Sequence, residues 1–301
     1  MEEYHMKDYI IRAVTKDDHI RAFAAITTEM VNTAQKMHDT YPIATAALGR
    51  TLTAAAMMIV MLKGENDSIT LQLKGDGPLG RIVTVADAQA NVKGYVSNPH
   101  VHLPNKLNGK LDVGGAVGRN GFMSVVRDLG LKEPYVGQVP LVSGEIAEDL
   151  TLYYARSEQI PSAVALGVLV DTDLSVKASG GFIVQIMPGA DDNTAKKIED
   201  IIAHLPSITT MITEGLDAQG LLEHVLDGFE LEVLDKIKPQ YHCDCSRERI
   251  ERALISIGQE EMQKIIEEQG QAELTCHFCN HQYQFNKQQL GDLLTKAIVP
   301  E

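Results

Sequence analysis

The stretch Tyr241–Arg247 reads Y-H-C-D-C-S-R, and Thr275–Asn280 reads T-C-H-F-C-N. Together they hold all four cysteines of this 301-residue chain. The cysteines form a C-x-C pair and a C-x-x-C pair with thirty residues between them: Cys243 and Cys245, then Cys276 and Cys279. Four thiolates in two close pairs suit a tetrahedral zinc ion, which binds sulfur at about 2.3 Å. We therefore predict that these four cysteines bind one Zn²⁺ per chain.

Three histidines beside the cysteines are alternative ligands: His242, His277 and His281. The C-x-C pair is closer than the spacing common in zinc fingers, whereas the C-x-x-C pair matches it. Four sulfurs already complete a tetrahedral shell. We therefore expect the histidines to be neighbours of the site and not ligands.

Metal binding would also decide whether the C-terminal residues, 241–301, fold. A unit of about 60 residues buries little apolar surface, and such units often depend on a metal or on disulfides. In small zinc modules metal binding is worth roughly 10–16 kcal/mol, and that free energy drives folding. Oxidation of the thiolates would release the metal, and each pair supplies a second cysteine to resolve a sulfenic acid. The sequence therefore predicts a unit that oxidation unfolds.

Composition narrows the class of protein. Hydrophobic residues make up 44% of the chain and the formal net charge is −14, so we expect a sizeable core and no general affinity for nucleic-acid phosphates. The N-terminus lacks a signal-peptide core, and the apolar stretch 43–62 contains Arg50, so we interpret it as a buried helix. We expect a cytoplasmic protein with no membrane partner. Thiols stay reduced in the cytoplasm, so paired cysteines there indicate metal or redox chemistry.

Residues 1–189 are expected to form one α+β domain. Residues 20–64 have a helical pattern, with Pro42 in a first turn and Gly64 as a stop. From residue 68 to residue 187, short β-rich runs alternate with turn residues too closely for a helix between each pair of strands. The expected strands are 69–74, 81–85, 92–97, 122–126, 150–155, 164–170 and 182–187. This pattern predicts Ala-rich helices and mainly antiparallel sheets.

Residues 190–240 have a different, acidic composition, with eleven Asp or Glu, four Lys and a net charge of −7. Short helical patterns at 193–205 and 220–226 are separated by Pro and Gly residues. Two interpretations stay open: a helical linker with little stability of its own, or a conventional small helical subdomain. Seven apolar residues are candidates for a face that covers the main domain: Ile198, Ile201, Ile202, Leu205, Leu221, Leu222 and Val225.

The third unit, 241–301, has its own helix and hairpin signals. Ser246 is placed to cap a helix that Gly258 ends, and 260–269 predicts a second helix. Residues 272–285 alternate like a hairpin with the C-x-x-C at the turn. Asn286 is placed to cap a last helix, 287–297.

No common catalytic motif indicates an enzymatic function for this chain. Residues 75–80, G-D-G-P-L-G, fit the spacing of the dinucleotide fingerprint, but an apparent strand follows where the fingerprint requires a helix. We interpret these residues as a hairpin loop. The sequence contains no G-x-x-x-x-G-K-[ST], no H-E-x-x-H and no G-x-S-x-G. We therefore expect neither ATP use nor an enzymatic activity, and we name no catalytic residue.

Several segments resemble one known family. They are R-A-F-A-A-I-T-T-E-M-V (21–31), A-A-L-G-R-T-L-T-A-A (46–55), the G-x-G-P-L-G loop, G-Y-V-S-N-P (94–99), G-G-F-I-V-Q-I-M-P-G (180–189) and C-H-F-C-N-x-x-Y-x-F (276–285). With the cysteine spacing, they make essentially the whole chain resemble heat shock protein 33, a family of redox-regulated bacterial holdases. Residues 1–6 have no counterpart that we can assign.

The resemblance implies a chaperone that oxidation activates. The reduced chain would bind one zinc ion through the four cysteines and be inactive. Peroxide, hypochlorous acid or heat with oxidation would release the zinc and form the disulfides Cys243–Cys245 and Cys276–Cys279. The zinc unit and the linker would then lose structure. The active form would dimerise, with a monomer possible when reduced, and would hold unfolding client proteins without ATP.

Two other functions fit parts of the sequence. A zinc-containing nucleic-acid binder needs a basic surface, but residues 241–301 carry ten acidic and six basic side chains. A thiol–disulfide oxidoreductase would use the C-x-x-C, which is expected in a hairpin and not at the start of a helix. The holdase is therefore the function that we predict.

Overall fold

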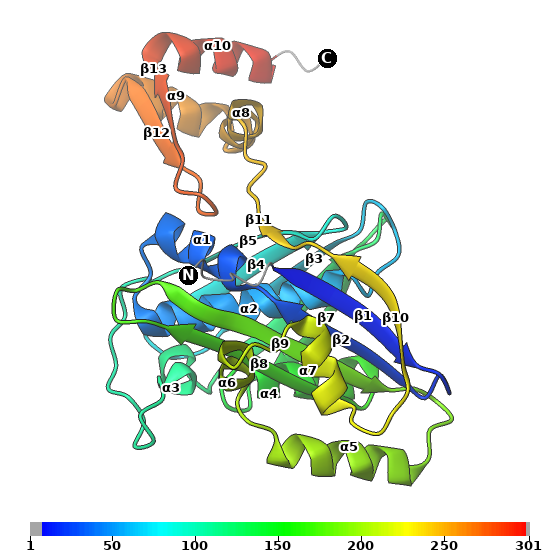
Figure 1. The fold of residues 1–301 in the computed structure, drawn as a ribbon. Coiled ribbons are helices and arrows are strands. Elements are labelled where there is room, and N and C mark those ends of the chain that lie inside the picture. Colours follow the sequence, from blue (N-terminus) through cyan, green and yellow to red (C-terminus); the bar gives the residue numbers. More distant parts are fainter. Residues whose placement is uncertain (1–7, 299–301) are drawn as a thin grey trace, which may run out of the picture. The chain divides into compact units, whose positions relative to one another are not determined.

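The computed structural model describes residues 8–298, and its chain divides into two compact units, Met1–His242 and Cys243–Glu301. Figure 1 shows the path of the chain through both units. The predicted linker, 190–240, belongs by its contacts to the first unit. The division at residues 189 and 240 that the sequence suggests stays a prediction.

Two sheets form the framework of the first unit. One contains β1 (Tyr9–Thr15), β2 (Ile20–Ile26), β8 (Ser162–Val170), β9 (Val176–Ile186) and β10 (Leu231–Ile237), in the order β10-β1-β2-β9-β8. The other contains β3 (Ser68–Lys74), β4 (Arg81–Asp87), β5 (Asn91–Val96), β6 (Phe122–Asp128), β7 (Tyr135–Pro140) and β11 (Gln240–Tyr241), in the order β11-β5-β4-β3-β6-β7. The pairing of β11 with β5 is parallel and the others are antiparallel. The predicted fold class, α+β with mainly antiparallel sheets, is confirmed.

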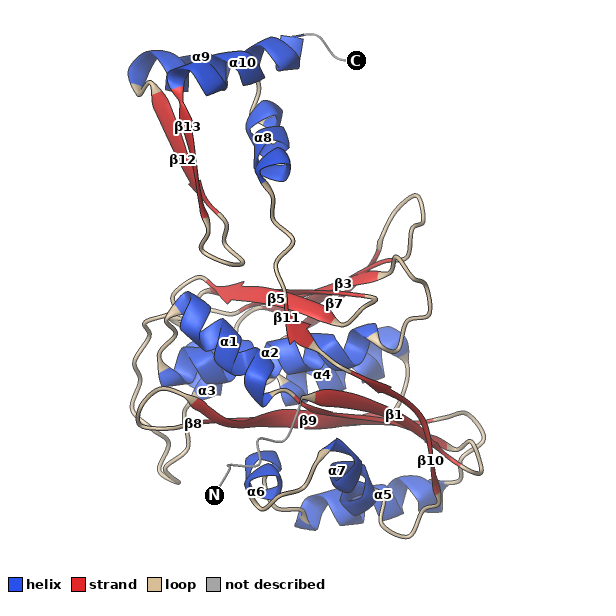
Figure 2. Ribbon diagram, turned by 45° about the horizontal axis from the view of Figure 1, so that its top comes forward, coloured by secondary structure: helices blue, strands red, loops and turns tan. Residues whose placement is uncertain are grey.

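Helices fill the space between the two sheets and cover one outer face (Figure 2). Between the sheets lie α1 (Thr28–His38), α2 (Pro42–Ile59), α3 (Val113–Val117) and α4 (Ala147–Tyr153), which continues into the π-helix Tyr154–Glu158. The outer face of the five-stranded sheet is covered by α5 (Asp192–His204), α6 (Ile208–Thr213) and α7 (Ala218–Val225). The first unit is therefore a stack of sheet, helices, sheet and helices.

The apolar stretch at 43–62 forms the central helix of this stack. Helix α2 is long and apolar enough to cross a membrane, yet 89% of the apolar window is buried inside the structure. It contacts strands of both sheets. The buried-helix interpretation is confirmed.

The five-stranded sheet buries apolar side chains on both faces, and strand β2 illustrates this. Phe23 and Ala25 belong to the core between the sheets, whereas Ala24 and Ile26 belong to the core beneath α5–α7. Neighbouring side chains on a strand point to opposite faces, so a strand buried on both faces shows no polar alternation. For this reason the helical prediction for residues 20–64 was wrong at 20–26, although it was right for α1 and α2.

The strand predicted at 150–155 is also wrong, because these residues form the end of α4 and the π-helix. The carboxylate of Asp149 accepts hydrogen bonds from the backbone N–H groups of Val142 (2.7 Å) and Ile146 (3.0 Å), which fixes the start of α4. This capping outweighs the β-propensity of the L-T-L-Y-Y run that follows. The other six predicted strands are present, and residues 75–80 form the predicted hairpin loop between β3 and β4.

The second unit contains three helices and one hairpin: α8 (Arg247–Ser256), α9 (Gln259–Glu268), β12 (Gln271–Thr275), β13 (Gln282–Asn286) and α10 (Lys287–Ile298). The predicted caps are confirmed. Ser246 Oγ accepts the N–H of Arg249 at 3.3 Å, and Asn286 Oδ1 accepts the N–H of Gln289 at 2.9 Å. A small apolar core joins these elements: Leu254, Met262, Ile266, Cys276, Tyr283, Phe285, Leu290 and Leu293.

Candidate metal centre

The four cysteines come from two segments of the second unit. Cys243 and Cys245 lie just before α8, and Cys276 and Cys279 lie in the turn that joins β12 to β13. All four thiols are free, and Cys276 is the most buried, at 8% exposed. The fold therefore brings together both cysteine pairs that the sequence separates.

The sulfur atoms form a compact group. All four Sγ atoms lie within 4.8 Å of one another. Cys243 Sγ is 3.8 Å from Cys276 Sγ, and Cys245 Sγ is 3.3 Å from Cys279 Sγ. Two sulfurs bound to one tetrahedral ion at about 2.3 Å would be about 3.8 Å apart. The residues present therefore fit a tetrahedral metal ion with four thiolate ligands.

The backbone of the β12–β13 turn presents the C-x-x-C pair. The N–H of Asn280 donates to the carbonyl of Cys276 at 2.8 Å, and the N–H of Cys276 donates to the carbonyl of His281 at 2.9 Å. Asn280 has φ +57°, in the left-handed region that Asn adopts more readily than most residues. These bonds close the turn that carries the two sulfurs.

The thiols differ in proton affinity. Burial raises the pKa of Cys243, and burial likewise raises the pKa of Cys279 to about 11. At Cys245 burial acts in the same direction, but hydrogen bonds from Tyr283 and the neighbouring thiols outweigh it and lower the pKa. A bound divalent cation favours the thiolate form of every ligand, because metal binding displaces the protons.

The histidines beside the cysteines do not join the sulfur group. Among the residues that the structure describes, the group able to hold a metal consists of the four cysteines. The His281 ring packs edge-on against Tyr283, with ring centroids 4.7 Å apart. His242 belongs to the first unit, where its N–H donates to the carbonyl of Val92 at 2.9 Å.

One contact at the site was not predicted from the sequence. The hydroxyl of Tyr283, on β13, donates a hydrogen bond to Cys245 Sγ at 3.1 Å. The alternating pattern of the hairpin places residue 283 on the inward face, together with Phe285. That pattern could have shown that the ring is buried, but not that its hydroxyl reaches a sulfur from the other segment.

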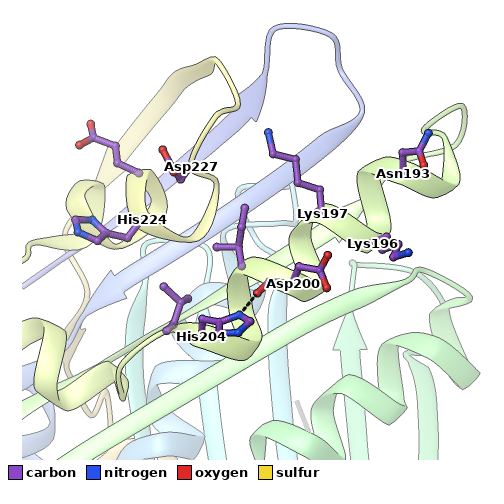
Figure 3. Close-up of a pocket in the computed structure, with 10 residues that line it drawn as sticks. Asn193, Lys196, Lys197, Asp200, His204, His224 and Asp227 are labelled. Carbon is purple, nitrogen blue, oxygen red and sulfur yellow. Dashed lines mark hydrogen bonds between the residues drawn. The ribbon is translucent and has the colours of Figure 1, made fainter.

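The first unit has an open cavity of about 820 Å³ between α5 and α7 (Figure 3). Its rim mixes charges of both signs, including Lys196, Lys197 and Asp200. The two histidines at the cavity point Nδ1 back to their own helices, His204 to the carbonyl of Asp200 (2.7 Å) and His224 to that of Gly220 (2.9 Å). This arrangement does not group an acid, a base and a nucleophile, so we assign no chemistry to the cavity.

The predicted covering residues of 190–240 lie against the five-stranded sheet. Ile198, Leu221, Leu222 and Val225 are at most 3% exposed and belong to the core on its outer face, against which Ile202 and Leu205 also pack. Ile201 lines the open cavity. In the described structure, α5–α7 therefore cover an apolar sheet face.

Known proteins of one family are similar to this chain over most of its length. The family model described as "Hsp33 protein" matches residues 8–286. A protein named 33 kDa chaperonin from Clostridium perfringens (strain SM101) is 52% identical over 300 residues, covering 98% of this chain and 95% of the relative. Another 33 kDa chaperonin, from Acetivibrio thermocellus, is 54% identical over 285 residues and covers 95% of this chain and 96% of its own.

A solved structure is similar over nearly the full length. The crystal structure of the 33 kDa chaperonin of Thermotoga maritima, a heat shock protein 33 homologue, has a TM-score of 0.89 and 40% identity. The match covers 97% of this chain and 99% of the other. The chain described here therefore belongs to the Hsp33 family of heat shock chaperones.

Proposed function

We propose that this chain is an ATP-independent holdase that is inactive when reduced and zinc-bound, and that oxidation activates. The observation that carries the proposal is the sulfur cluster. Four Sγ atoms from two segments converge within 4.8 Å, in a unit whose described core has eight buried hydrophobic residues. A core of that size gives little stability by itself, so a unit held by its cysteines can be unfolded by oxidising them.

The ligands of the proposed zinc ion are Cys243, Cys245, Cys276 and Cys279. When bound, Zn²⁺ would supply a tetrahedral cross-link and keep the four sulfurs as thiolates. The protein's part is to bring the ligands together: the segment before α8 provides one pair and the β12–β13 turn the other. Loss of the ion would therefore remove the main link between the two segments.

The cysteine sulfurs are the groups that peroxide oxidises. A thiolate attacks one oxygen of hydrogen peroxide, the O–O bond breaks, and the products are a sulfenate and water. After protonation, a second thiolate attacks the sulfenic sulfur, forming a disulfide and releasing hydroxide. We propose the pairs Cys243–Cys245 and Cys276–Cys279, as the family resemblance implies, because partners within three residues stay close when the unit unfolds. Such small loops would not replace the stability lost with the metal.

The proposed client surface is the apolar face beneath α5–α7. Strand β11 ends two residues before Cys243 and pairs with β5, and β10 pairs with β1. We propose that residues 241–301 are the redox switch, that 190–240 are the linker released by it, and that 1–189 bind clients. Detachment of α5–α7 would expose an apolar patch that includes Ala22, Ile26 and Phe182, and such patches bind unfolded chains.

The partners that we propose follow from this function. Membership of a chaperone family implies unfolded client proteins. We propose a homodimer for the active form, a monomer or dimer when reduced, a cytoplasmic location, no nucleic-acid or membrane partner, and no enzymatic activity. A compartment that keeps thiols reduced would hold the switch in its inactive state.

A holdase assay tests the proposal. Reduced, zinc-loaded protein and peroxide-treated protein are each mixed with a chemically denatured enzyme, and aggregation is followed by light scattering with and without ATP. We expect the oxidised form alone to suppress aggregation, equally with and without ATP. Equal activity of both forms would contradict the redox switch, and a requirement for ATP would contradict the holdase. A variant with serine at all four cysteine positions controls for oxidation elsewhere.

A further inference from the structure

We infer that Tyr283 is a positioning residue of the sulfur cluster, whose hydroxyl slows the oxidation of Cys245 and so helps to set the order in which the cysteines react. The inference rests on the proposed function, because it concerns the rate at which peroxide attacks that cluster. The hydroxyl lies 3.1 Å from Cys245 Sγ, as the donor of the hydrogen bond. Tyr283 is 8% exposed and belongs to the core of the second unit.

Solvent exposure does not explain which of three cysteines an oxidant would attack first. Cys243, Cys245 and Cys279 are all partly exposed, and Cys276 is buried. An oxidant can therefore reach three cysteines, and differences among these must come from the groups that contact each sulfur. Tyr283 supplies a donor from a side chain, and a single substitution can remove that donor.

The position of the Tyr283 hydroxyl is well fixed. Residue 283 pairs with Leu274 across the hairpin, and its ring packs edge-on against His281 at 4.7 Å between centroids. Phe285, on the same face of β13, is 1% exposed. The hydroxyl is therefore held against Cys245 by the hairpin that also carries Cys276 and Cys279. The contact links the C-x-C pair to the C-x-x-C hairpin through Tyr283, a side chain that is not itself a proposed metal ligand.

A hydrogen bond to a thiolate makes the thiolate a weaker nucleophile towards peroxide. The lone pair that accepts the proton is less available to attack peroxide. With zinc bound, the sulfur of Cys245 would be a thiolate with or without the hydroxyl, so the hydrogen bond would add no thiolate and would only lower its nucleophilicity. The attack converts the Cys245 thiolate and hydrogen peroxide into a sulfenate and water, and it proceeds more slowly while the hydroxyl is bound. Groups that hydrogen-bond metal ligands also orient them, and their removal typically weakens metal binding about 10–100-fold. Loss of the hydroxyl should therefore weaken zinc binding and expose Cys245 to earlier oxidation.

The test compares wild type with Tyr283→Phe, which keeps the ring and removes the hydroxyl. Zinc affinity is measured by competition with a colorimetric chelator, and zinc release is followed after addition of hydrogen peroxide. Sulfenic acids formed in the first minutes are trapped with dimedone and located by mass spectrometry. We expect Tyr283→Phe to bind zinc about 10–100-fold more weakly, to release it several-fold faster, and to carry more trapped label on Cys245 relative to Cys279.

Two control variants separate the hydroxyl from general loosening. Tyr154→Phe removes another buried tyrosine hydroxyl that donates to a sulfur, that of Met61 at 3.3 Å in the first unit, and should behave as wild type. Phe285→Leu loosens the core of the second unit but keeps the Tyr283 hydroxyl, so it should not shift label towards Cys245. If Tyr283→Phe matches wild type, or if Phe285→Leu gives the same shift, the inference is overturned. A wild-type chain that binds no zinc would instead overturn the proposed function.

Discussion

The Sγ atom of Cys245 lies 3.3 Å from that of Cys279, although the two residues are 34 positions apart in the chain. A second contact, of 3.8 Å, joins Cys243 to Cys276. Both contacts link the C-x-C pair to the C-x-x-C pair, so the folded cluster ties the segment before α8 to the β12–β13 turn. Loss of the contacts among the four sulfurs should therefore destabilise the second unit.

Removal of the metal should unfold the second unit and leave the first intact. Metal binding contributes roughly 10–16 kcal/mol in small zinc modules, more than the few kcal/mol that a core of this size supplies. Under reducing conditions with a strong chelator, amide hydrogen exchange in residues 247–298 should become fast. Exchange in α2, which lies between the two sheets, should stay slow. Protection of α8–α10 that survives chelation would show that the unit folds without metal.

Oxidation should produce disulfides between sequence neighbours, although the folded cluster brings cysteines of different pairs together. Trypsin distinguishes the two results, because Arg247, Arg249, Arg252 and Lys264 lie between the pairs. Disulfides Cys243–Cys245 and Cys276–Cys279 leave two separate tryptic peptides, each with an internal bridge. A bridge from Cys245 to Cys279 joins the two peptides until it is reduced. A joined peptide as the main product would mean that oxidation proceeds in the folded unit and would contradict the proposed pairing.

Leu221→Ala should loosen the packing of α7 and lower the peroxide dose at which anti-aggregation activity appears. Leu221 is 0% exposed in the core beneath the five-stranded sheet, and such truncations cost about 2–5 kcal/mol. Amide exchange in α7 should accelerate, and anti-aggregation activity should appear at a lower peroxide dose. Glu223→Ala, at an exposed position on the same helix, is the matched control and should change neither. Unchanged activity in a variant with a demonstrably loosened α7 would separate this helix from client binding.

The sequence allows the sulfur cluster to be predicted more completely than the sheets. Cysteine spacing alone indicates the four candidate ligands, because few other chemistries use two close pairs. Strand β2 could not be recognised, because both faces of its A-F-A-A-I run are buried and no polar alternation remains. Strand β10, an edge strand of exposed and half-buried residues within an acidic region, has too few buried positions to reveal it. The Tyr283–Cys245 contact joins residues 38 positions apart and depends on the tertiary fold.

Stability should depend on pH through Asp8. The carboxylate accepts hydrogen bonds from the backbone N–H groups of Glu29 (3.0 Å) and Met30 (2.7 Å), and burial raises its pKa from 3.8 to about 6. Since the folded state holds this proton more tightly than the unfolded chain, the contribution of Asp8 is fully present below about pH 4 and is lost as pH rises through 6. Full ionisation costs up to about 3 kcal/mol.

Asp8→Asn tests this dependence. The amide has one acceptor oxygen, so one of the two N–H groups loses its partner at every pH. Apart from this constant loss, the variant should gain stability relative to wild type between pH 4 and pH 7, by up to about 3 kcal/mol. Urea titrations at several pH values measure it. Asp76→Asn should show the opposite trend, because hydrogen bonds from Asn120 lower the pKa of Asp76 and its contribution is lost as pH falls. A difference between Asp8→Asn and wild type that does not vary between pH 4 and pH 7 would refute the assignment.

The most direct test of the account follows zinc release and holdase activity together in one reaction. Peroxide is added to the reduced, zinc-loaded protein at a heat-shock temperature, a colorimetric chelator reports the zinc set free, and timed samples are scored for suppression of aggregation. We predict that one zinc per chain leaves and that holdase activity rises with its release. If zinc stays bound while activity appears, or leaves with no gain in activity, the cluster is a structural element and not a switch.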